Sequence, residues 1–174
     1  MRNKKRHLVT GGAGFLGSHL IDKLMKRDEC VICIDNLSTG NLKNIHQWID
    51  HPLFEFIHKD VNDEYDFKVD FVWHLASKAS PFNYVKNPIE SSLTNFLGTF
   101  NALNIAKRSN AKFIFTSSSE IYGFTKKFPL MENDWGIVNP NGVRSCYVEG
   151  KRIAESLAFD FQRTYGLNVC VARI

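Results

Sequence analysis

Tyr147 and Lys151, in the last third of the chain, have the residue types and the spacing for proton transfer. They are four positions apart in a segment with helical spacing, so we expect both side chains on one helix face. A phenol, with a reference pKa of about 10, is a poor base near neutral pH, but a neighbouring ammonium favours its ionised form. The pair therefore indicates a tyrosine base that takes a proton from a hydroxyl group while hydride leaves the same carbon. A surface pair without chemical importance would have the same spacing.

A run of polar residues, SSSE at 117–120, follows an apolar strand pattern and supports the chemical interpretation. Ligands of parallel sheets bind beyond the carboxyl ends of the strands, which is where this run would lie. We expect Ser118 to donate a hydrogen bond to the reacting oxygen beside Tyr147. Without the tyrosine and the lysine, a polar strand end would be the simpler interpretation.

A glycine-rich turn near the start of the chain indicates dinucleotide binding. Gly11, Gly14 and Gly17 form G-x-x-G-x-x-G between a strand pattern and a helix pattern. Glycine lets the backbone turn tightly and approach a pyrophosphate, whose charge is stabilised by N–H groups at the helix N-terminus. Asp35 ends the next strand pattern, 18 positions after Gly17, where a carboxylate accepts hydrogen bonds from ribose hydroxyls and repels a 2′-phosphate. The turn thus predicts NAD rather than NADP, although a tight turn without a ligand is the alternative.

The apolar pattern explains how these groups could be held together. Strand-like runs occur at 7–10, 30–34, 54–58, 71–75, 112–116 and 168–172. Apolar residues at three- and four-residue steps predict helices within 15–25, 96–106 and 153–161. Alternating strands and helices predict an α/β fold, a Rossmann-type doubly wound parallel sheet with helices on both faces. The segment 123–145 is rich in Gly, Pro, Asn and charge and predicts a long functional loop.

Length and composition favour one soluble globular domain. The chain has 174 residues, 44% hydrophobic and 23% charged, and no apolar run near the roughly 20 residues that cross a bilayer. Its charged start lacks the apolar core of a secretory signal, so we expect a cytoplasmic protein without a membrane partner. The net charge is +4, and the basic cluster Arg2, Lys4, Lys5 and Arg6 could be a nucleic-acid or targeting patch. A solvated lead-in to the first strand is favoured, and no nucleic-acid partner is expected.

The cysteines and histidines predict no metal centre. Four cysteines are too few for a disulfide framework. Cys30 and Cys33 spell C-x-x-C but lie in a strand pattern, where side chains three apart point to opposite faces. They are interpreted as packing residues in a reducing compartment. The six histidines lack metal-ligand spacings such as H-E-x-x-H.

These motifs together resemble the extended short-chain dehydrogenases/reductases, a family of enzymes that act on nucleotide sugars. The shared features are TGGAGFLGSHL, the strand end HLA, a serine or threonine, and Y-x-x-x-K. Within that family the chain is most similar to the UDP-glucuronate decarboxylases over essentially its whole length. The stretches that carry this similarity are 9–25, DNLSTG at 35–40, HLASKASPFNY at 74–84, SSSEIYG at 117–123 and NPNGVRSCYVEGKRIAE at 139–155.

The resemblance implies a mechanism in which NAD+ oxidises the C4 hydroxyl of UDP-glucuronate. Tyr147 would be the base, with Lys151, Ser118 and Glu120 in support. The 4-keto sugar would lose CO2, and hydride return would give UDP-xylose. The related 4,6-dehydratases usually carry an Asp-Glu pair where this chain has Ser119-Glu120. Elimination of water needs that acid and decarboxylation does not, so the decarboxylase is favoured over a 4,6-dehydratase. A 4-epimerase of the same family is a further alternative.

The resemblance also assigns binding residues. Those at the adenosine end of NAD would be Phe15, Leu16, Asn36, Ser38, Thr39 and Gly40, with Asp60 and Val61 near the adenine. Those on the nicotinamide ribose side would be Leu75, Ala76 and Ser77, and Ser117, Tyr147 and Lys151 would also bind the cofactor. On the sugar side would be Tyr84, Asn95, Ser118 and Glu120. Core packing is the alternative for Leu75 and Val61, and a helix position for Asn95.

Two substitutions and the chain length qualify the resemblance. Lys78 replaces a usual proline, and Ser118 replaces a usual threonine but keeps the hydroxyl. The chain stops at an apolar strand, so we expect that 1–174 is the NAD-binding domain of a longer protein whose substrate-binding domain is missing. Such a fragment would bind NAD but be inactive, and the whole enzyme would be a homodimer through helices like 88–108 and 144–165. A non-catalytic NAD-binding module is the alternative if 174 residues is the natural length.

Overall fold

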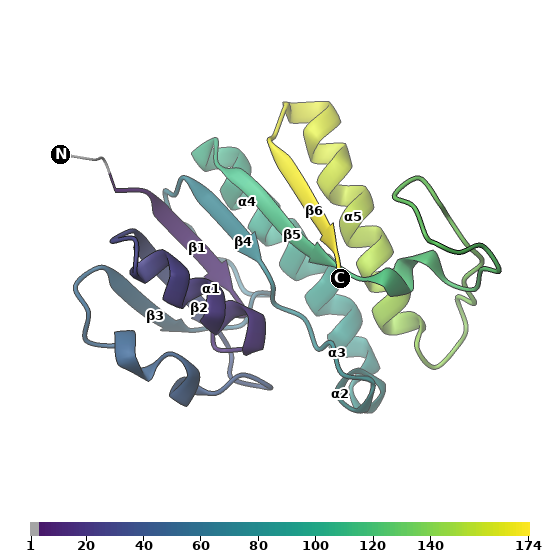
Figure 1. Cartoon of the computed structure of the whole chain (residues 1–174), viewed down its shortest axis with the longest axis horizontal. Helices are drawn as coiled ribbons and strands as arrows, with labels where there is room; N and C mark the ends of the chain where they lie inside the picture. The colour runs from purple at the N-terminus through teal and green to yellow at the C-terminus, as the bar shows by residue number, and fades with distance from the viewer. Residues whose placement is uncertain (1–3) are drawn as a thin grey trace.

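The computed structural model describes residues 4–174 and forms a single parallel sheet with helices on both sides (Figure 1). Met1 to Asn3, and with them Arg2 of the basic cluster, lie outside the described residues. The strands are β1 (Arg6–Thr10), β2 (Cys30–Asp35), β3 (Phe54–His58), β4 (Phe71–His74), β5 (Lys112–Ser117) and β6 (Val169–Arg173). Each predicted strand is present, with bounds that differ by one residue at most.

The strand order is β3-β2-β1-β4-β5-β6, and every neighbouring pair is parallel. This order is that of the Rossmann fold, so the predicted fold class is confirmed. Strands β2 and β3 lie on one side of β1, and β4, β5 and β6 lie on the other, so the strand order switches direction between β1 and β4. The strand ends beside that point form the crevice in which ligands of such sheets bind.

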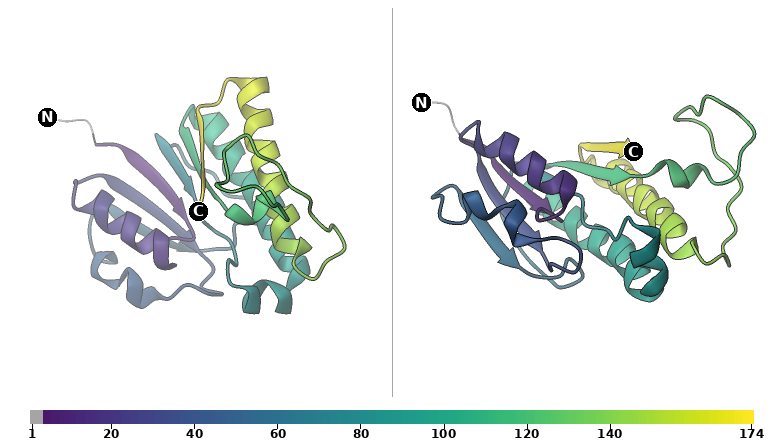
Figure 2. Two further views of the ribbon diagram at one scale, coloured as in Figure 1. Left: turned by 45° about the vertical axis from the view of Figure 1, so that its right-hand side comes forward. Right: turned by 60° about the horizontal axis from the view of Figure 1, so that its bottom comes forward.

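Helices cover both faces, which explains why the strands are almost continuously apolar. Leu8 packs in the core beneath α4 (Thr99–Ser109) and α5 (Ser145–Tyr165), whereas its neighbour Val9 packs beneath α1 (Phe15–Met25). Figure 2 shows α1 on one side of the sheet and α4 and α5 on the other. Cys33 is buried beneath α1 while Cys30 is half-buried, and the four cysteines are free thiols. Cys33 is therefore a packing residue, as predicted.

The helix predicted within 96–106 is longer than its apolar spacing suggested. The chain after β4 forms the short helices α2 (Pro81–Lys86) and α3 (Pro88–Leu93), and α3 continues through a π-helical turn, Thr94–Gly98, into α4. A π turn holds an extra residue and changes the phase of the apolar positions, so a regular 3.6-residue pattern detects only its C-terminal part. The run ends at Asn110, which adopts the left-handed conformation common at helix ends.

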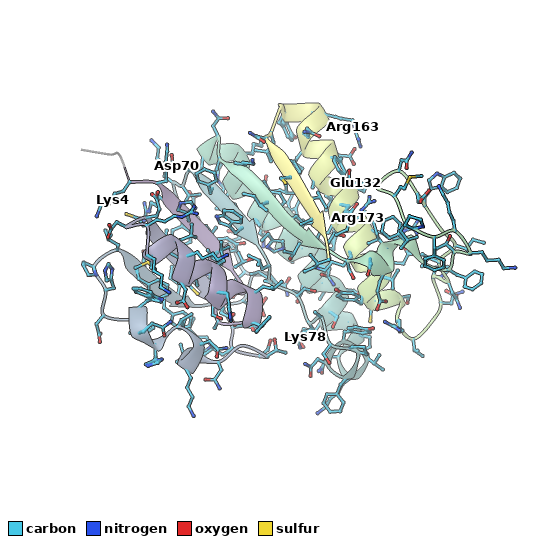
Figure 3. The ribbon with its side chains drawn as sticks, in the orientation of Figure 1. Lys4, Asp70, Lys78, Glu132, Arg163 and Arg173 are labelled. Carbon is cyan, nitrogen blue, oxygen red and sulfur yellow. The ribbon has the colours of Figure 1, made fainter. Side chains whose placement is uncertain are left out.

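The segment that follows β5 is the predicted long loop. It starts with a 3-10 turn at Ser119–Tyr122 and returns to α5 at Ser145, with one antiparallel bridge between Phe124 and Ile137. Arg173 at the end of β6 ties this loop to the sheet, because its Nη1 donates to the Glu132 carbonyl at 2.6 Å and to the Tyr122 hydroxyl at 3.0 Å (Figure 3). The loop is thus anchored beside the carboxyl ends of β5 and β6.

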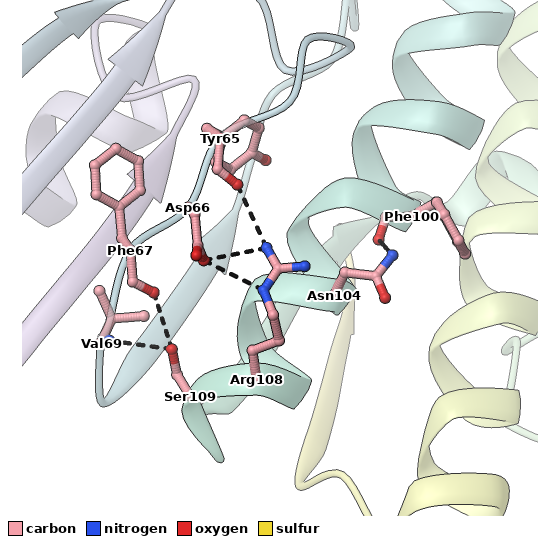
Figure 4. A network of polar contacts seen from close by, with 8 residues as sticks. All are labelled: Tyr65, Asp66, Phe67, Val69, Phe100, Asn104, Arg108 and Ser109. Atoms are coloured by element: carbon pink, nitrogen blue, oxygen red, sulfur yellow. Dashed lines mark hydrogen bonds and ion pairs between the residues drawn. The ribbon is translucent and has the colours of Figure 1, made fainter.

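The connection between β3 and β4 is held by the C-terminal end of α4 (Figure 4). The Ser109 hydroxyl donates to the Phe67 carbonyl at 2.9 Å and accepts from the Val69 N–H at 3.2 Å. Arg108 forms an ion pair with Asp66 at 3.2 Å. These bonds fix an irregular segment and give hydrogen-bond partners to backbone N–H and C=O groups that are not paired with a strand.

Across residues 4–174, no helix has both the length and the apolar character required to cross a membrane.

Candidate active site

The glycine turn is built for a close approach of two backbone segments. Gly11 follows β1 with φ of +69°, and a Cβ there would lie 2.8 Å from the backbone N of Ala76. A Cβ on Gly17 would lie 2.3 Å from the Gly11 carbonyl oxygen. Gly14 is the N-terminal cap of α1 and has no side chain with which to cap the first N–H groups of the helix. Those N–H groups remain available to an anion, because Gly14, Phe15 and Gly17 line a cavity.

Asp35, the last residue of β2, lies in the wall of that cavity. Its carboxylate accepts the Ala13 N–H at 2.9 Å and the Leu37 N–H at 2.8 Å, so its position is fixed by the glycine turn and by the following loop. Burial raises the pKa of the Asp35 carboxyl, and the two backbone hydrogen bonds and His58 partly offset that rise. Each carboxylate oxygen keeps a lone pair for a further donor such as a ribose hydroxyl.

The cavity has a volume of about 390 Å³ and lies where the strand order reverses, between the N-terminus of α1 and the segment after β4. Its size is within the range of small-molecule and cofactor sites. The structure brings most of the predicted cofactor-binding residues to its wall: Gly11, Gly14, Phe15, Leu16, Gly17, Asp35, Asn36, Ser38, Thr39, Val61, Leu75, Ala76 and Ser77.

The other predicted cofactor-binding residues lie around the cavity without lining it. Asp60 accepts the Asn36 side-chain amide at 2.6 Å, and Gly40 packs against Asp35 so closely that a Cβ would lie 2.9 Å from its Oδ1. Ser117 ends β5 and is buried, and its hydroxyl has no hydrogen-bond partner among the described residues. Tyr147 and Lys151 lie on α5, beyond β5 from the turn.

Several cavity residues were missed by the sequence reasoning, namely Ile34, Lys59, Lys78, Ala79, Ser80, Asn83 and Thr94. Lys78, noted only as a departure from the family pattern, is buried and pairs with Glu90 of α3 at 2.6 Å. Ser80 precedes Pro81 as the N-cap of α2. A serine before a proline is a recognisable helix start, and it could have located this wall of the cavity.

Tyr147 and Lys151 lie in the first two turns of α5, on its buried face, as their spacing predicted. The Lys151 ammonium donates to the Thr116 carbonyl at 2.9 Å and lies 5.9 Å from the centre of the Tyr147 ring. Burial lowers the pKa of Lys151 to about 7, and the charge of Glu155 opposes that shift.

The phenol of Tyr147 differs from the sequence expectation in one respect. Burial raises its pKa, a hydrogen bond with Ser118 lowers it, and the charges of Glu120 and Tyr84 raise it. The expectation of a pKa lowered by Lys151 is therefore wrong for the protein alone. The reason is physical: burial penalises the phenolate, while the lysine bonds to a strand carbonyl instead of to the phenol.

The serine and the glutamate of SSSE lie beside this phenol. Ser118 is buried and caps the 3-10 turn by accepting the Glu120 N–H at 3.3 Å. Glu120 forms an ion pair with Arg144, the residue that precedes α5. The structure thus brings Ser118, Glu120 and Tyr147 together at the carboxyl end of β5.

The two residues predicted for the sugar side are buried. Tyr84 is fully buried, and its hydroxyl accepts the Arg144 Nε–H at 2.9 Å. Asn95 accepts the Ser77 hydroxyl at 2.9 Å and donates to the Ser91 carbonyl at 2.9 Å. Their contact with a sugar stays a prediction.

A buried histidine, missed at the sequence level, supports the turn from below. His74 of the strand end HLA lies 2.8 Å from the Thr10 hydroxyl and 3.1 Å from the Thr99 hydroxyl. Burial, together with the charge of Lys151, lowers its pKa to about 3, so the imidazole is neutral. It joins the end of β1, just before the glycine turn, to β4 and α4.

Within residues 4–174, no three or more His, Cys, Asp or Glu side chains are grouped so that they could hold a metal ion.

The sequence matches a family model described as GDP-mannose 4,6 dehydratase over residues 8–174. The chain belongs to this family. UDP-glucuronic acid decarboxylase 6 of Arabidopsis thaliana is 50% identical to it, in an alignment that covers 100% of the chain and 53% of that protein. UDP-glucuronic acid decarboxylase 1 of Danio rerio is 48% identical, with 99% of the chain and 41% of that protein covered. The chain therefore spans about half the length of the first of these relatives and about two fifths of the second.

Solved structures of similar proteins share the fold. The UDP-glucose 4-epimerase of Thermotoga maritima, solved with UDP-glucose, is 33% identical with a TM-score of 0.84, over 97% of this chain and 54% of that one. The dTDP-glucose 4,6-dehydratase DesIV of Streptomyces venezuelae, solved with NAD bound, is 29% identical with a TM-score of 0.82, over 97% and 55%. The resemblance to extended short-chain dehydrogenases, and among them to the UDP-glucuronate decarboxylases, is thereby confirmed.

Proposed function

We propose that the chain is the cofactor-binding and catalytic part of an NAD-dependent UDP-glucuronate decarboxylase, which makes UDP-xylose through a 4-keto sugar. The observation that carries the proposal is the placement of Ser118, Glu120 and Tyr147 beside one another at the carboxyl end of β5, with Lys151 on the same helix face as the tyrosine. A relative that is 50% identical over the aligned residues, which are 53% of its length, is named as a UDP-glucuronic acid decarboxylase.

The residues of the cavity fit NAD. The glycine turn and the open N-terminus of α1 would hold the pyrophosphate, and Asp35 would accept the adenosine ribose hydroxyls. A buried carboxylate at that wall disfavours the 2′-phosphate of NADP. Bound NAD supplies the acceptor for hydride from the sugar and its donor for the return.

The side chains of this chain transfer the proton of the C4 hydroxyl and hold the reacting oxygen in place. Tyr147 takes the proton of the C4 hydroxyl at its phenol oxygen and later returns it, and Ser118 donates a hydrogen bond that holds the reacting oxygen beside it. The cationic form of Lys151 favours the phenolate. Once C4 is a carbonyl, the C6 carboxylate is β to it, so CO2 leaves with the bonding pair delocalised onto the carbonyl oxygen. The enolate that remains takes a proton from solvent at C5, which restores the C4 carbonyl before hydride returns. Loss of CO2 itself needs no protein acid.

A 4,6-dehydratase is the second candidate, and the description of the family model favours it. Elimination of water needs an acid that protonates the leaving hydroxyl. Position 119, where such enzymes usually carry an aspartate, is an exposed serine in the 3-10 turn. A serine hydroxyl is too weak an acid for that step, so the decarboxylase is the better supported of the two.

We also propose a homodimer of the whole enzyme through the helical layer of α3, α4 and α5. Exposed apolar side chains lie on these helices and on the π turn between α3 and α4, namely Ile89, Leu93, Phe96, Phe100 and Ile153. A face of this kind is typical of a protein interface. Sedimentation of the whole enzyme tests this proposal. The parent is expected to be a dimer and Phe96→Glu a monomer, and a variant that stays dimeric would contradict the proposal. The free cysteines fit the further proposal of a cytoplasmic location.

The test uses the protein that carries this chain together with a C-terminal part of the kind its relatives have. Incubated with UDP-glucuronate and NAD+, it is expected to form UDP-xylose and CO2. Absence of both products, or formation of a 6-deoxy-4-keto sugar from a nucleotide hexose instead, would contradict the proposal. Tyr147→Phe is expected to keep NAD affinity within about twofold and to lose turnover by about 10² or more.

A further inference from the structure

Arg144 makes two contacts that the proposed chemistry does not yet use. It is the last residue before α5, and its half-exposed guanidinium donates from Nε to the Tyr84 hydroxyl at 2.9 Å. Its Nη2 forms the ion pair with Glu120. One side chain thus joins the start of α5 to α2 and to the 3-10 turn after β5. A planar guanidinium fixes the direction of both partners, because its donors have a rigid geometry.

Tyr84 transmits this contact to the proposed base. Its ring stacks on the Tyr147 ring with 4.8 Å between centroids and 8° between planes. Tyr84 is fully buried and lies in α2, which packs at the N-terminal end of α5 (Figure 1). A stacked aromatic neighbour restricts the rotation of a ring. Holding the Tyr84 hydroxyl therefore holds the plane of the Tyr147 phenol.

The second contact concerns the charges around the phenol. The titratable and charged groups that face Tyr147 are Lys151 on α5, Glu120 on the 3-10 turn, Tyr84 on α2 and, through the last two, Arg144. The Glu120 carboxylate raises the pKa of Tyr147. A cation paired with that carboxylate offsets part of its effect.

We propose that Arg144 is a positioning residue for Tyr147: it holds Tyr84 flat against the phenol and neutralises Glu120 beside it. Arg144 acts only through these two residues. The inference rests on the proposed role of Tyr147 as the base, but its test needs neither NAD nor a sugar, so it can fail while the decarboxylase proposal stands.

The experiment is NMR of the 174-residue chain labelled with 13C at tyrosine Cζ. The chain has 5 tyrosines, so the spectrum is simple, and Tyr147→Phe and Tyr84→Phe assign the two signals. Arg144→Gln is expected to shift both signals at neutral pH and to raise the Tyr147 titration midpoint by about one pH unit. Glu120→Gln is expected to lower that midpoint. Arg144→Lys keeps the positive charge but lacks the two-pronged guanidinium. Its Tyr147 midpoint should therefore equal that of the parent, whereas its Tyr147 and Tyr84 signals should stay shifted.

A matched control is Arg152→Gln. Arg152 also lies on α5 and also binds the 3-10 turn, through the Ile121 carbonyl at 3.3 Å, but it contacts neither Tyr84 nor Glu120. It should leave the Tyr147 signal and midpoint unchanged. A folded Arg144→Gln variant with a wild-type Tyr147 signal and midpoint would overturn the proposal. If that variant does not fold, Arg144→Lys and Tyr84→Phe decide, because unchanged Tyr147 signals in both would overturn it equally.

Discussion

The Lys151 ammonium donates a hydrogen bond to the carbonyl oxygen of Thr116, 2.9 Å away at the end of β5. The lysine is buried, and burial lowers its pKa from 10.5 to about 7. The unfolded chain keeps this proton up to the higher pH, whereas the folded chain loses it near neutrality. Between those two values the unfolded state binds more protons, so the free energy of unfolding should increase with pH.

Lys151→Met removes the group that causes this slope. We expect the variant to be more stable than the parent by about 2 kcal/mol at pH 7 and to lose most of the increase from pH 7 to 10. Urea unfolding at a series of pH values measures it. Lys112→Met, which changes an exposed lysine of β5, is the control. A slope that survives in Lys151→Met would show that another group is responsible.

His74 should also make the free energy of unfolding increase with pH, but in a lower pH range. Its pKa is lowered from 6.5 to about 3, chiefly by burial, so the folded imidazole stays neutral where the unfolded one is protonated. Stability should therefore fall as the pH falls from 6.5 towards 3. His74→Gln should flatten this fall, whereas exposed His46→Gln should not. The denaturation midpoint against pH measures both, and an equal fall in all three proteins would contradict the assignment.

A comparison of alanine variants at Gly11 and Gly166 distinguishes the cost of backbone strain from the cost of a steric clash. Both have positive φ, +69° and +67°, but a Cβ on Gly166 meets nothing within 4 Å, whereas one on Gly11 lies 2.8 Å from the Ala76 backbone. Gly166→Ala should cost about 1 kcal/mol of unfolding free energy. Gly11→Ala should cost at least about 2 kcal/mol more and weaken NAD binding. Equal costs in chemical denaturation would mean that the turn can open without penalty.

Arg173 and Glu155 form a bidentate pair, with distances of 3.1 Å and 2.9 Å, in which the carboxylate is buried and the guanidinium is half-buried. A guanidinium is charged at any pH of the experiment, so loss of Glu155 leaves the Arg173 cation without its carboxylate partner. Glu155→Gln should therefore destabilise the chain by about 3 kcal/mol. Glu149→Gln, which removes an exposed pair with Arg152, should cost less than about 1 kcal/mol. Thermal unfolding that ranks the two variants in the opposite order would refute this.

The sequence was sufficient for whatever depends on local pattern. The strands could be predicted because each is a short, mostly apolar run, and in β1 and β2 nearly every residue is buried. The turn at Gly11 and the buried face of α5 followed from spacing in the same way. The start of the helix at Pro88 could not, because a π turn changes the phase of the apolar pattern before α4.

The contacts that join distant segments could not be predicted from one sequence. Lys78 reaches Glu90, and Arg144 reaches Tyr84, only because the sheet places the segment after β4 beside α5. The direction of the Tyr147 pKa shift was wrong for a related reason. Spacing shows that a lysine is near, but not that it bonds to Thr116 or how deeply the phenol is buried.

The most direct test of the proposed reaction uses UDP-glucuronate with deuterium at C4. It is supplied to the protein that carries this chain and its C-terminal part, with NAD+. The account predicts UDP-xylose that keeps the deuterium at C4, with one CO2 for each product. Loss of the label to water, or UDP-xylose formed equally well after removal of NAD, would contradict it.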